Sequence, residues 1–298
     1  YLMKTQKNIL LVINPIAGGT DKRPIIKAFK EQVAAQNKES HVYETTGKND
    51  KEAIQELVSS KQPDRILISG GDGTIREVAD AIKGVSVTIG LLPSGSANGL
   101  ATNFDIPEDL DRQLAIALGE EYIDMDLLDI NGYTCLHIAD LGVNAQLVEN
   151  YEKSEIRGKL GYLIQAFPTL LNKDFPFKVS IDCDGKIYQE EGILIGIANA
   201  NKFGTGATIN PTGKMDDGIF EVLVFKNFSV KGILETFYDD AHLDPDFVKV
   251  IPCKAVKINA ENPIAFQIDG EFMGKKETIH AKMTSDKLRI AIPKSFNH

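Results

Sequence analysis

The sequence predicts an α/β domain followed by a mostly-β domain, because the two parts of the chain show different residue patterns. The first 120 residues alternate apolar runs rich in β-branched residues with segments of helical spacing. From about Met125 onward, short alternating runs are separated by Asn-Gly and Asp-Gly dipeptides, which are typical of tight turns. We therefore expect a doubly wound α/β domain over residues 4–124 and an antiparallel β-sandwich over residues 125–284.

The elements of the first domain follow from apolar periodicity. Pro24 suits the first turn of a helix, and Asp50 is expected to cap the next one. Ligands of parallel sheets bind beyond the carboxyl ends of the strands, so we expect binding residues in the segments that follow the strands. The pattern predicts strands at Asn8–Ile13, His41–Thr45, Arg65–Ser69 and Val87–Leu92, and helices at Pro24–Gln36, Asp50–Ser60 and Ile75–Ile82.

The second domain is punctuated by four tight-turn dipeptides, which predict hairpins and sharp turns between short strands. The dipeptides are Asn131-Gly132, Asp184-Gly185, Asp217-Gly218 and Asp269-Gly270. The expected strands are Glu191–Ala198, Ile219–Phe225, Ala255–Asn259 and Ile264–Ile268, and the expected helices are Lys159–Leu171 and Val230–Asp239.

Composition and charge exclude several classes of protein. A formal net charge of −9 argues against nucleic-acid binding and against a broad basic membrane-binding surface. No apolar stretch is long enough to span a membrane, and the N-terminal apolar run is interrupted by Asn14-Pro15 as no signal peptide would be. Three widely spaced cysteines, Cys135, Cys183 and Cys253, are expected to be reduced thiols in a cytoplasmic protein.

The most informative stretch runs from Ile66 to Thr74. A buried strand is followed by three glycines around Asp72, and Thr74 then opens the helical segment. Glycines let the backbone approach an anion, and the free N–H groups of a helix start face it, so the segment suits a phosphate. Asp72 is placed to bind the Mg²⁺ that accompanies a nucleotide. An ordinary turn between strand and helix produces the same glycine pattern, and this alternative stays open for the loop taken alone.

Gly70-Gly71-Asp72-Gly73-Thr74 resembles the nucleotide loop of the diacylglycerol kinase catalytic-domain family, which includes bacterial lipid kinases and sphingosine and ceramide kinases. The resemblance implies an N-terminal domain like that of NAD kinases and phosphofructokinases. It also implies that the C-terminal segment, residues 285–298, returns to the first domain, with Leu288–Ile292 as the returning strand.

Two further loops extend this resemblance. Asn14-Pro15-Ile16-Ala17-Gly18 is similar to the family's first nucleotide loop, and Pro93–Gly99 to its third, although Gly99 stands where bacterial members commonly have aspartate. Neither a Rossmann glycine motif nor a Walker loop is present. The resemblance assigns nucleotide contacts to Asn14, Pro15, Ile16, Ala17, Gly18, Thr45, Gly70, Gly71, Asp72, Gly73, Thr74, Ile75, Arg76 and Ser96.

Metal ligands are implied at two places. Lys214–Ile219 resembles the family's magnesium turn, in which the side chain of Asp217 and the backbone carbonyls of Lys214 and Ile219 would bind the ion. Asp126 matches a member of the family's aspartate network around Mg²⁺. A plain Asp-Gly turn and a solvated carboxylate at a strand end are equally good explanations of these residues.

Asp269-Gly270-Glu271 matches the family's D-G-E signature, whose glutamate is the proposed proton acceptor. Phosphoryl transfer to an alcohol needs positioning, charge neutralisation and a base for the hydroxyl proton. Glu271 is therefore the expected base, with Asp269 next, and Glu271 and Asp72 are the expected catalytic residues.

The resemblance implies an ATP-dependent lipid kinase that phosphorylates the hydroxyl of a diacylglycerol-like lipid, with ATP as donor and Mg²⁺ as cofactor. A sphingoid-base or ceramide kinase is the nearest alternative because Gly99 suits that branch, and a nucleotide-binding module without turnover is another. An NAD kinase is disfavoured because its NAD loop is not found. The expected partner is a lipid at a membrane surface, the expected location is cytoplasmic and peripheral to the membrane, and a homodimer is left open.

Overall fold

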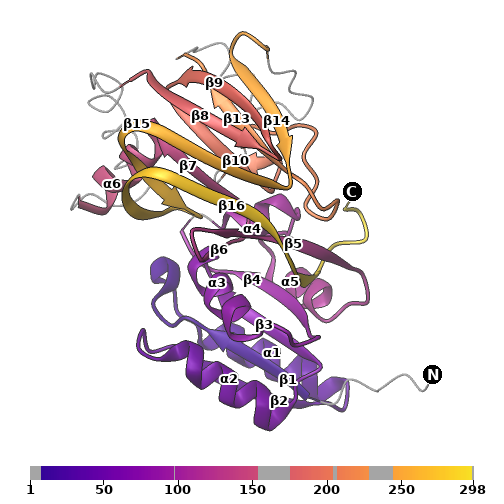
Figure 1. The fold of residues 1–298 in the computed structure, drawn as a ribbon. Helices are drawn as coiled ribbons and strands as arrows, with labels where there is room; N and C mark the ends of the chain where they lie inside the picture. Colours follow the sequence, from indigo (N-terminus) through magenta and orange to yellow (C-terminus); the bar gives the residue numbers. More distant parts are fainter. Residues whose placement is uncertain (1–7, 97, 154–174, 204–206, 228–243, 297–298) are drawn as a thin grey trace. The chain divides into compact units, whose positions relative to one another are not determined.

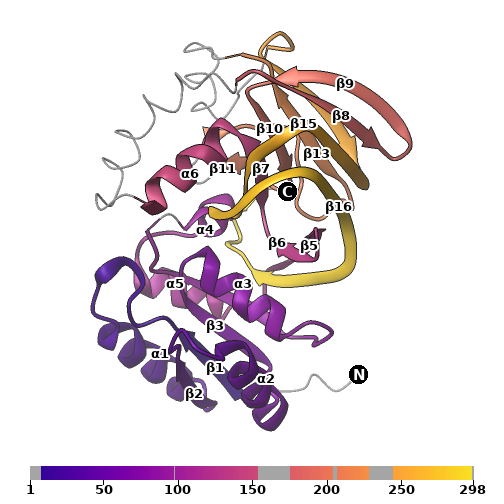
Figure 2. The same ribbon diagram turned by 60° about the vertical axis from the view of Figure 1, so that its left-hand side comes forward.

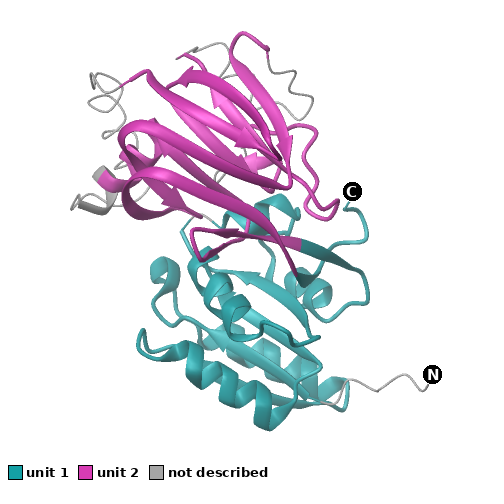
Figure 3. Ribbon diagram, in the orientation of Figure 1, with its two compact units in different colours: residues 1–125, 286–298 teal, residues 126–285 magenta. Residues whose placement is uncertain are grey.

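The computed structural model describes residues 8–96, 98–153, 175–203, 207–227 and 244–296. The chain divides into two compact units (Figures 1 and 3). Unit 1 contains residues 1–125 and 286–298, and unit 2 contains residues 126–285. The two expected helices over 159–171 and 230–239 lie outside the described residues.

Unit 1 is a parallel sheet with the strand order β16-β4-β3-β1-β2, of which β16 contributes only its last residues. Arg289 of β16 pairs with Thr88 of β4, so the C-terminal segment does return to this sheet as the resemblance implied. The strands are β1 (Asn8–Ile13), β2 (Glu39–Glu44), β3 (Arg65–Gly70), β4 (Thr88–Pro93) and the end of β16 (Glu271–Ala291).

Helices pack on both faces of this sheet, and Figure 2 shows them on either side of it. Alternate residues of each strand point to opposite faces, so the side of β1 that carries Ile9 and Leu11 packs against Phe29 and Val33 of α1. The helices are η1 (Ala17–Gly19), α1 (Arg23–Ala35), α2 (Asp50–Lys61), α3 (Asp72–Ala81), α4 (Gly99–Asn103) and α5 (Leu110–Ala117).

The predicted elements of unit 1 are confirmed within a few residues, but one detail is wrong. Asp50 does not cap α2, because it is the first residue of that helix and its carboxylate points back to the preceding loop. It accepts the backbone N–H groups of Thr46 (2.8 Å) and Gly47 (2.6 Å) and the hydroxyl of Tyr43 (2.7 Å). A buried carboxylate is thus used to fold the loop that follows β2.

Unit 2 is an antiparallel β-sandwich, as predicted. One run of strands has the order β14-β13-β10-β7-β15-β16, and β8 and β9 extend it from β15. Its elements are β5 (Tyr122–Ile130), which begins in unit 1, β6 (Tyr133–Cys135), β7 (Ile138–Gly142), α6 (Val143–Lys153), β8 (Phe177–Cys183), β9 (Lys186–Gly192), β10 (Leu194–Ala198), β11 (Lys202–Phe203), β12 (Ala207–Thr208), β13 (Phe220–Phe225), β14 (Val248–Cys253) and β15 (Ala255–Ile268).

Two sequence predictions in unit 2 are corrected by this strand set. The single strand expected over Glu191–Ala198 is the end of β9 followed by β10. The two strands expected over Ala255–Ile268 are one strand, β15, whose pairing with β16 shifts register between Asn259 and Ile264. Such an irregularity bends a strand, so β15 pairs with β8 along its first half and with β7 along its last residues.

Three of the four turn dipeptides form two-residue hairpin loops. In each loop both central residues have positive φ, for example 48° at Asp269 and 84° at Gly270, as a type I′ turn requires. These loops join β5 to β6, β8 to β9 and β15 to β16. Asp217-Gly218 is different, because only Gly218 has positive φ and the dipeptide precedes β13 without closing a hairpin.

The core of unit 2 contains a disulfide that the sequence did not reveal. Cys183 of β8 and Cys253 of β14 are joined, at a sequence separation of 70 residues, and both are buried in the hydrophobic cluster of the sandwich. Cys135 is buried and takes no part in this disulfide. The expectation of three reduced thiols is therefore wrong for two of them, because strands distant in sequence bring their sulfur atoms together.

Candidate functional site

Three loops follow β1, β3 and β4 at the carboxyl-terminal edge of the parallel sheet in unit 1. Backbone hydrogen bonds join the starts of these loops, since Asn14 N–H donates to Ser69 O (2.8 Å) and Ser94 N–H donates to Gly70 O (3.0 Å). The hydroxyls of Ser69 and Ser94 lie 3.1 Å apart. The strand order thus gathers the first, second and third predicted nucleotide loops at one edge, where parallel sheets bind their ligands.

Glycines allow these loops to pack backbone against backbone. A Cβ atom on Gly95 would lie 2.5 Å from Gly71 Cα, and one on Gly18 would collide with the carbonyl oxygen of Ser94. Gly18 also has a φ of 60°, in the left-handed region that favours glycine. Gly18 and Gly95 are therefore required by close approach of main chains, and close packing of this kind is suited to a loop that binds a phosphate through its backbone.

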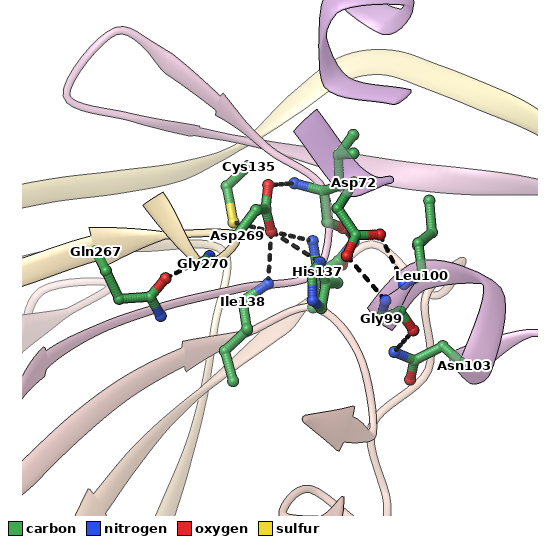
Figure 4. Close-up of polar contacts among 12 residues, drawn as sticks. Asp72, Gly99, Leu100, Asn103, Cys135, His137, Ile138, Gln267, Asp269 and Gly270 are labelled. Atoms are coloured by element: carbon green, nitrogen blue, oxygen red, sulfur yellow. Dashed lines mark hydrogen bonds and ion pairs between the residues drawn. The ribbon is translucent and has the colours of Figure 1, made fainter. Parts of the chain in front are cut away.

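Asp72 is the first residue of α3 and is half-buried. Its carboxylate accepts the N–H of Gly99 at 2.8 Å and that of Leu100 at 3.0 Å (Figure 4). These are free N–H groups of the first turn of α4, where negative charge is favoured by the helix dipole. Asp72 therefore connects the glycine loop to the third loop, and each of its oxygens keeps a lone pair for a further partner.

Two asparagines shape the outer loops. Asn98 accepts the N–H of Gly95 (2.8 Å) and donates to the carbonyl of the same residue (3.0 Å), so it holds the third loop as its sequence position suggested. Asn14 accepts the N–H of Ile16 (3.1 Å) and contacts the hydroxyl of Thr74 at 3.4 Å. The first loop is thus fixed both to itself and to the start of α3.

Lys22 is a residue of this cluster that sequence reasoning missed. Its side chain is buried, with Nζ 2.7 Å from Ala17 O, 2.8 Å from Thr20 Oγ1 and 3.4 Å from Ser94 O. Burial lowers the pKa of this ammonium group. The only signal in the sequence was a lysine between the first loop and its helix, which is ordinarily a solvated position.

A cavity of about 280 Å³ opens beside the first and third loops. Its walls include backbone of Gly18 and Gly95 and the side chains of Asn98 and Gln113. Thr45, at the end of β2, is buried and donates its N–H to Ile13 O. Of the other predicted contacts, Pro15, Ile16 and Ser96 are exposed and Arg76 is half-buried. Three more are buried, namely Gly70, Thr74 and Ile75.

The predicted base, Glu271, begins β16 directly after the third hairpin loop and is exposed. The side chain of the preceding Asp269 is buried, and its carboxylate accepts the backbone N–H groups of Leu136 (2.8 Å), His137 (3.0 Å) and Ile138 (3.1 Å) (Figure 4). It also lies 2.9 Å from His137 Nδ1. Both oxygens of the Asp269 carboxylate already accept hydrogen bonds, which hold the turn against the end of β6 and the start of β7. Asp269 is therefore poorly suited to act as a base.

The pKa of Asp269 agrees with that structural role. Burial by itself would raise the pKa, but the charge and hydrogen bond of His137 and the N–H groups of Leu136 and His137 outweigh it. The pKa therefore lies below the ordinary value, and the carboxylate stays ionised and bound. Between Asp269 and Glu271, only Glu271 is accessible to an outside hydroxyl.

The predicted magnesium turn lies within unit 2. Asp126 is buried and its Oδ2 accepts the N–H of Gly218 at 2.7 Å, while its own N–H donates to Met215 O at 2.7 Å. Asp217 is exposed and its Oδ1 accepts the N–H of Ile219 at 3.1 Å. Asp126 therefore holds the loop that carries Asp217, and within the described ranges no group of three His, Cys, Asp or Glu side chains could by itself hold a metal ion.

Comparison with known proteins identifies both halves of the chain. Residues 8–130 match the diacylglycerol kinase catalytic domain, and residues 138–292 match the YegS C-terminal NAD kinase beta sandwich-like domain. A probable lipid kinase YegS of Salmonella newport is 28% identical over 295 residues, with 95% of each chain covered.

Solved structures show the same fold. A diacylglycerol kinase from Bacillus anthracis aligns over 99% of this chain and 100% of its own, with a TM-score of 0.75 at 19% identity. An NAD kinase from Archaeoglobus fulgidus aligns over 96% and 94% of the two chains, with a TM-score of 0.55 at 13% identity. The chain therefore belongs to the diacylglycerol kinase catalytic-domain family with a YegS-type C-terminal domain, and the lipid kinase class inferred from its loops is confirmed at the level of the family.

Proposed function

We propose that this protein transfers the γ-phosphate of ATP to the hydroxyl of a diacylglycerol-like lipid. The observation that carries the proposal is the glycine-to-backbone packing of three loops at the carboxyl edge of the unit 1 sheet. Glycine-rich loops beside Asp72 and the start of α3 suit the phosphates of a nucleoside triphosphate. The family relationship supplies the lipid acceptor, because the matching relative is named as a lipid kinase.

Each residue then has a role in the transfer. The loops at Asn14–Gly18, Gly70–Arg76 and Ser96 bind ATP, and Lys22 fixes the first of them to the third. Glu271 accepts the hydroxyl proton as the lipid oxygen bonds to the γ-phosphorus, and the bond from that phosphorus to the bridging oxygen breaks so that ADP leaves. The protein works peripherally at the membrane surface where its substrate lies, and the described residues include no helix long and apolar enough to cross a membrane.

Mg²⁺ is part of this proposal. Asp72 keeps one lone pair on each oxygen, and Asp217 is exposed beside the carbonyls that the family pattern assigns to the ion. One carboxylate with two backbone carbonyls suits a cation that keeps most of its waters. When bound, the metal neutralises phosphate charge, and the protein residues named above bind, orient and deprotonate.

The proposal is tested with radiolabelled ATP and mixed micelles that contain diacylglycerol, monoacylglycerol, sphingosine or ceramide. Label in phosphatidic acid is the expected result. Label in sphingosine or ceramide alone would favour the alternative suggested by Gly99, whose N–H is bound to Asp72 and which leaves no carboxylate at that position. NADP formed from NAD, or ATP bound without any transfer, would overturn the proposal.

A further inference from the structure

The hairpins of unit 2 share a way of holding their turns. At the first of them, Gly132 donates its N–H to Asp129 Oδ1 at 3.2 Å. At the second, Gly185 donates its N–H to Asp182 Oδ1 at 3.0 Å. In both, the acceptor stands three residues before the glycine and is a carboxylate. An ionised carboxylate offers only acceptors, so any orientation of the group satisfies the turn.

The third hairpin, which precedes Glu271, uses a different acceptor at the same position. Gly270 donates its N–H to Gln267 Oε1 at 2.7 Å. An amide group has one acceptor end and one donor end, so only one of its two orientations can hold Gly270. Gln267 is buried, and water is not available to compensate for the wrong orientation. Something must therefore fix the amide.

Asp140 is the residue that fixes it. Gln267 Nε2 donates to Asp140 Oδ2 at 2.5 Å, across the antiparallel pairing of β15 with β7. Figure 4 shows the contact of Gln267 with Gly270. Asn144 Nδ2, in the first turn of α6, donates to the same oxygen at 2.6 Å. An ionised Asp140 can only accept, so it turns the amino end of Gln267 toward itself and leaves Oε1 for Gly270.

The surroundings of Asp140 make its charge costly. It is fully buried, and burial raises its pKa to about 6 although Gln267, Asn144 and the N–H of Ala145 oppose the rise. β10 places Gly196 opposite it. Of the titratable groups on the elements that pack against β7, Glu149 on α6 is bound to Gln146, and Asp269 after β15 is bound to His137. Asp140 is thus a solitary buried carboxylate held by two amides.

We propose that Asp140 is a positioning residue for phosphoryl transfer, because its ionised carboxylate orients Gln267, which in turn holds Gly270 and the turn that presents Glu271. The proposal deepens the proposed function and rests on it only for the role of Glu271. A proton on Asp140 would supply a donor to Gln267 Oε1 and allow the amide to turn over, so the N–H of Gly270 would lose its acceptor. The turn therefore loosens as the pH falls through the pKa of Asp140.

The first experiment follows the turn itself and needs no activity. The protein is labelled with ¹⁵N-glycine, and the amide resonance of Gly270 is recorded between pH 5 and 7.5 for wild type and Asp140→Asn. The Gly270 resonance is expected to titrate in wild type and not in the variant, while Gly132 and Gly185 serve as controls that the substitution leaves unchanged. A Gly270 resonance that ignores pH in this range, or that titrates equally in Asp140→Asn, would overturn the proposal.

The second experiment measures lipid phosphorylation. Asp140→Asn is expected to lower kcat about ten- to a hundredfold at pH 7.5 with KM for ATP unchanged, because only the base is misplaced. The double variant Asp140→Asn with Gln267→Glu moves the acceptor-only group to the position it has in the other two hairpins, and it should restore most of kcat. Glu277→Gln changes an exposed glutamate later in β16 and should retain kcat.

The outcomes separate this proposal from the proposed function. If wild type phosphorylates no lipid, the proposed function fails while the glycine resonances still decide the role of Asp140. If Asp140→Asn does not fold, the double variant and the wild-type titration decide it. Wild-type kcat in Asp140→Asn, or no gain from adding Gln267→Glu to a weakened Asp140→Asn, contradicts the positioning role.

Discussion

The predicted nucleotide loops of unit 1 and the Asp269–Glu271 turn of unit 2 are held by different means. In unit 1 the loops touch through backbone, with Gly95 against Gly71, and side chains such as that of Asp72 add hydrogen bonds between them. In unit 2 the turn is held by side chains that come from distant strands, Asp140 and Gln267 among them. Contacts between backbones do not titrate, whereas a buried carboxylate does.

This difference suggests a division of labour. A nucleotide is recognised through N–H groups that must keep one arrangement, and close backbone packing provides it. A base has to be presented at one position to a hydroxyl, and a network of hydrogen bonds can place it to within a fraction of an ångström. The cost is a buried charge at Asp140, which a protein built for stability alone would omit.

The largest predicted effect that tests this comparison is a loss of kcat on substitution of Glu271. Glu271→Gln keeps the shape of the side chain and removes the base, so kcat should fall by about 10²- to 10⁴-fold. ATP affinity should stay unchanged because the nucleotide loops belong to the other unit. Initial rates and calorimetric ATP binding measure the two. Glu277→Gln, an exposed glutamate of the same strand, is the matched control. Near wild-type kcat in a folded Glu271→Gln protein would assign the base elsewhere.

The next effect concerns stability and pH in unit 2. Because the folded pKa of Asp140 is about 6 against an ordinary 3.8, the native state holds a proton between these values that the unfolded state releases. Ionisation therefore costs wild type about 3 kcal/mol of unfolding free energy as the pH rises through this window. Asp140→Asn has no carboxyl group to ionise at this position, so it should be more stable than wild type at pH 7.

Urea unfolding followed by circular dichroism at pH 7 and below pH 4 measures this difference. The two proteins should converge at the acid end, where Asp140 is neutral in both the folded and the unfolded state. The expected signs are opposed, since Asp140→Asn gains stability at pH 7 while it loses turnover. A variant less stable than wild type at neutral pH would show that the two amide hydrogen bonds outweigh the desolvation of the charge.

A third effect tests the backbone packing of unit 1. Gly95→Ala places a methyl group 2.5 Å from Gly71 Cα, and because the obstacle is main chain, the loops must separate. Overpacking of this kind costs about 2 kcal/mol and should also weaken ATP binding. Gly73→Ala adds the same methyl where no atom lies within 4 Å, so it should leave the melting temperature unchanged. Equal melting temperatures for the two variants would contradict the close packing.

Much of this architecture was predictable from sequence because its signals are local. The strands, the helices of unit 1 and the glycine loops are encoded in short spacings, and the Asp269-Gly270 dipeptide specifies its own turn. The magnesium and nucleotide contacts read from family resemblance stay predictions, although the three loops do meet at one sheet edge.

What the sequence could not show are contacts between distant side chains. Gln267 and Asp140 are 127 residues apart, and Cys183 and Cys253 are 70 apart. Apolar periodicity marks these positions as strand residues and says nothing about which strands become neighbours. Lys22 was missed for a related reason, since a lysine beside a loop is ordinarily solvated and only the fold turns its ammonium group inward.

The smallest effect concerns Asp50, the buried carboxylate of unit 1 whose pKa shifts in the opposite direction to that of Asp140. Burial would raise the pKa of Asp50, but the N–H of Thr46, the hydroxyl of Tyr43 and the N–H of Gly47 outweigh it and lower it below 3.8. Its contribution to stability is therefore present above the ordinary pKa and is lost as the pH falls through the lower folded value.

Asp50→Asn should accordingly destabilise the protein by about 1 kcal/mol at pH 7, since one acceptor oxygen becomes a donor that faces backbone N–H groups. The stability that Asp50→Asn loses relative to wild type should become smaller as the pH falls. The stability that Asp140→Asn gains relative to wild type should also become smaller as the pH falls. Asp21→Asn, which changes an exposed carboxylate paired with Arg23, is the control and should leave urea midpoints unchanged. If Asp50→Asn were as stable as wild type at pH 7, the loop after β2 would not depend on its buried carboxylate.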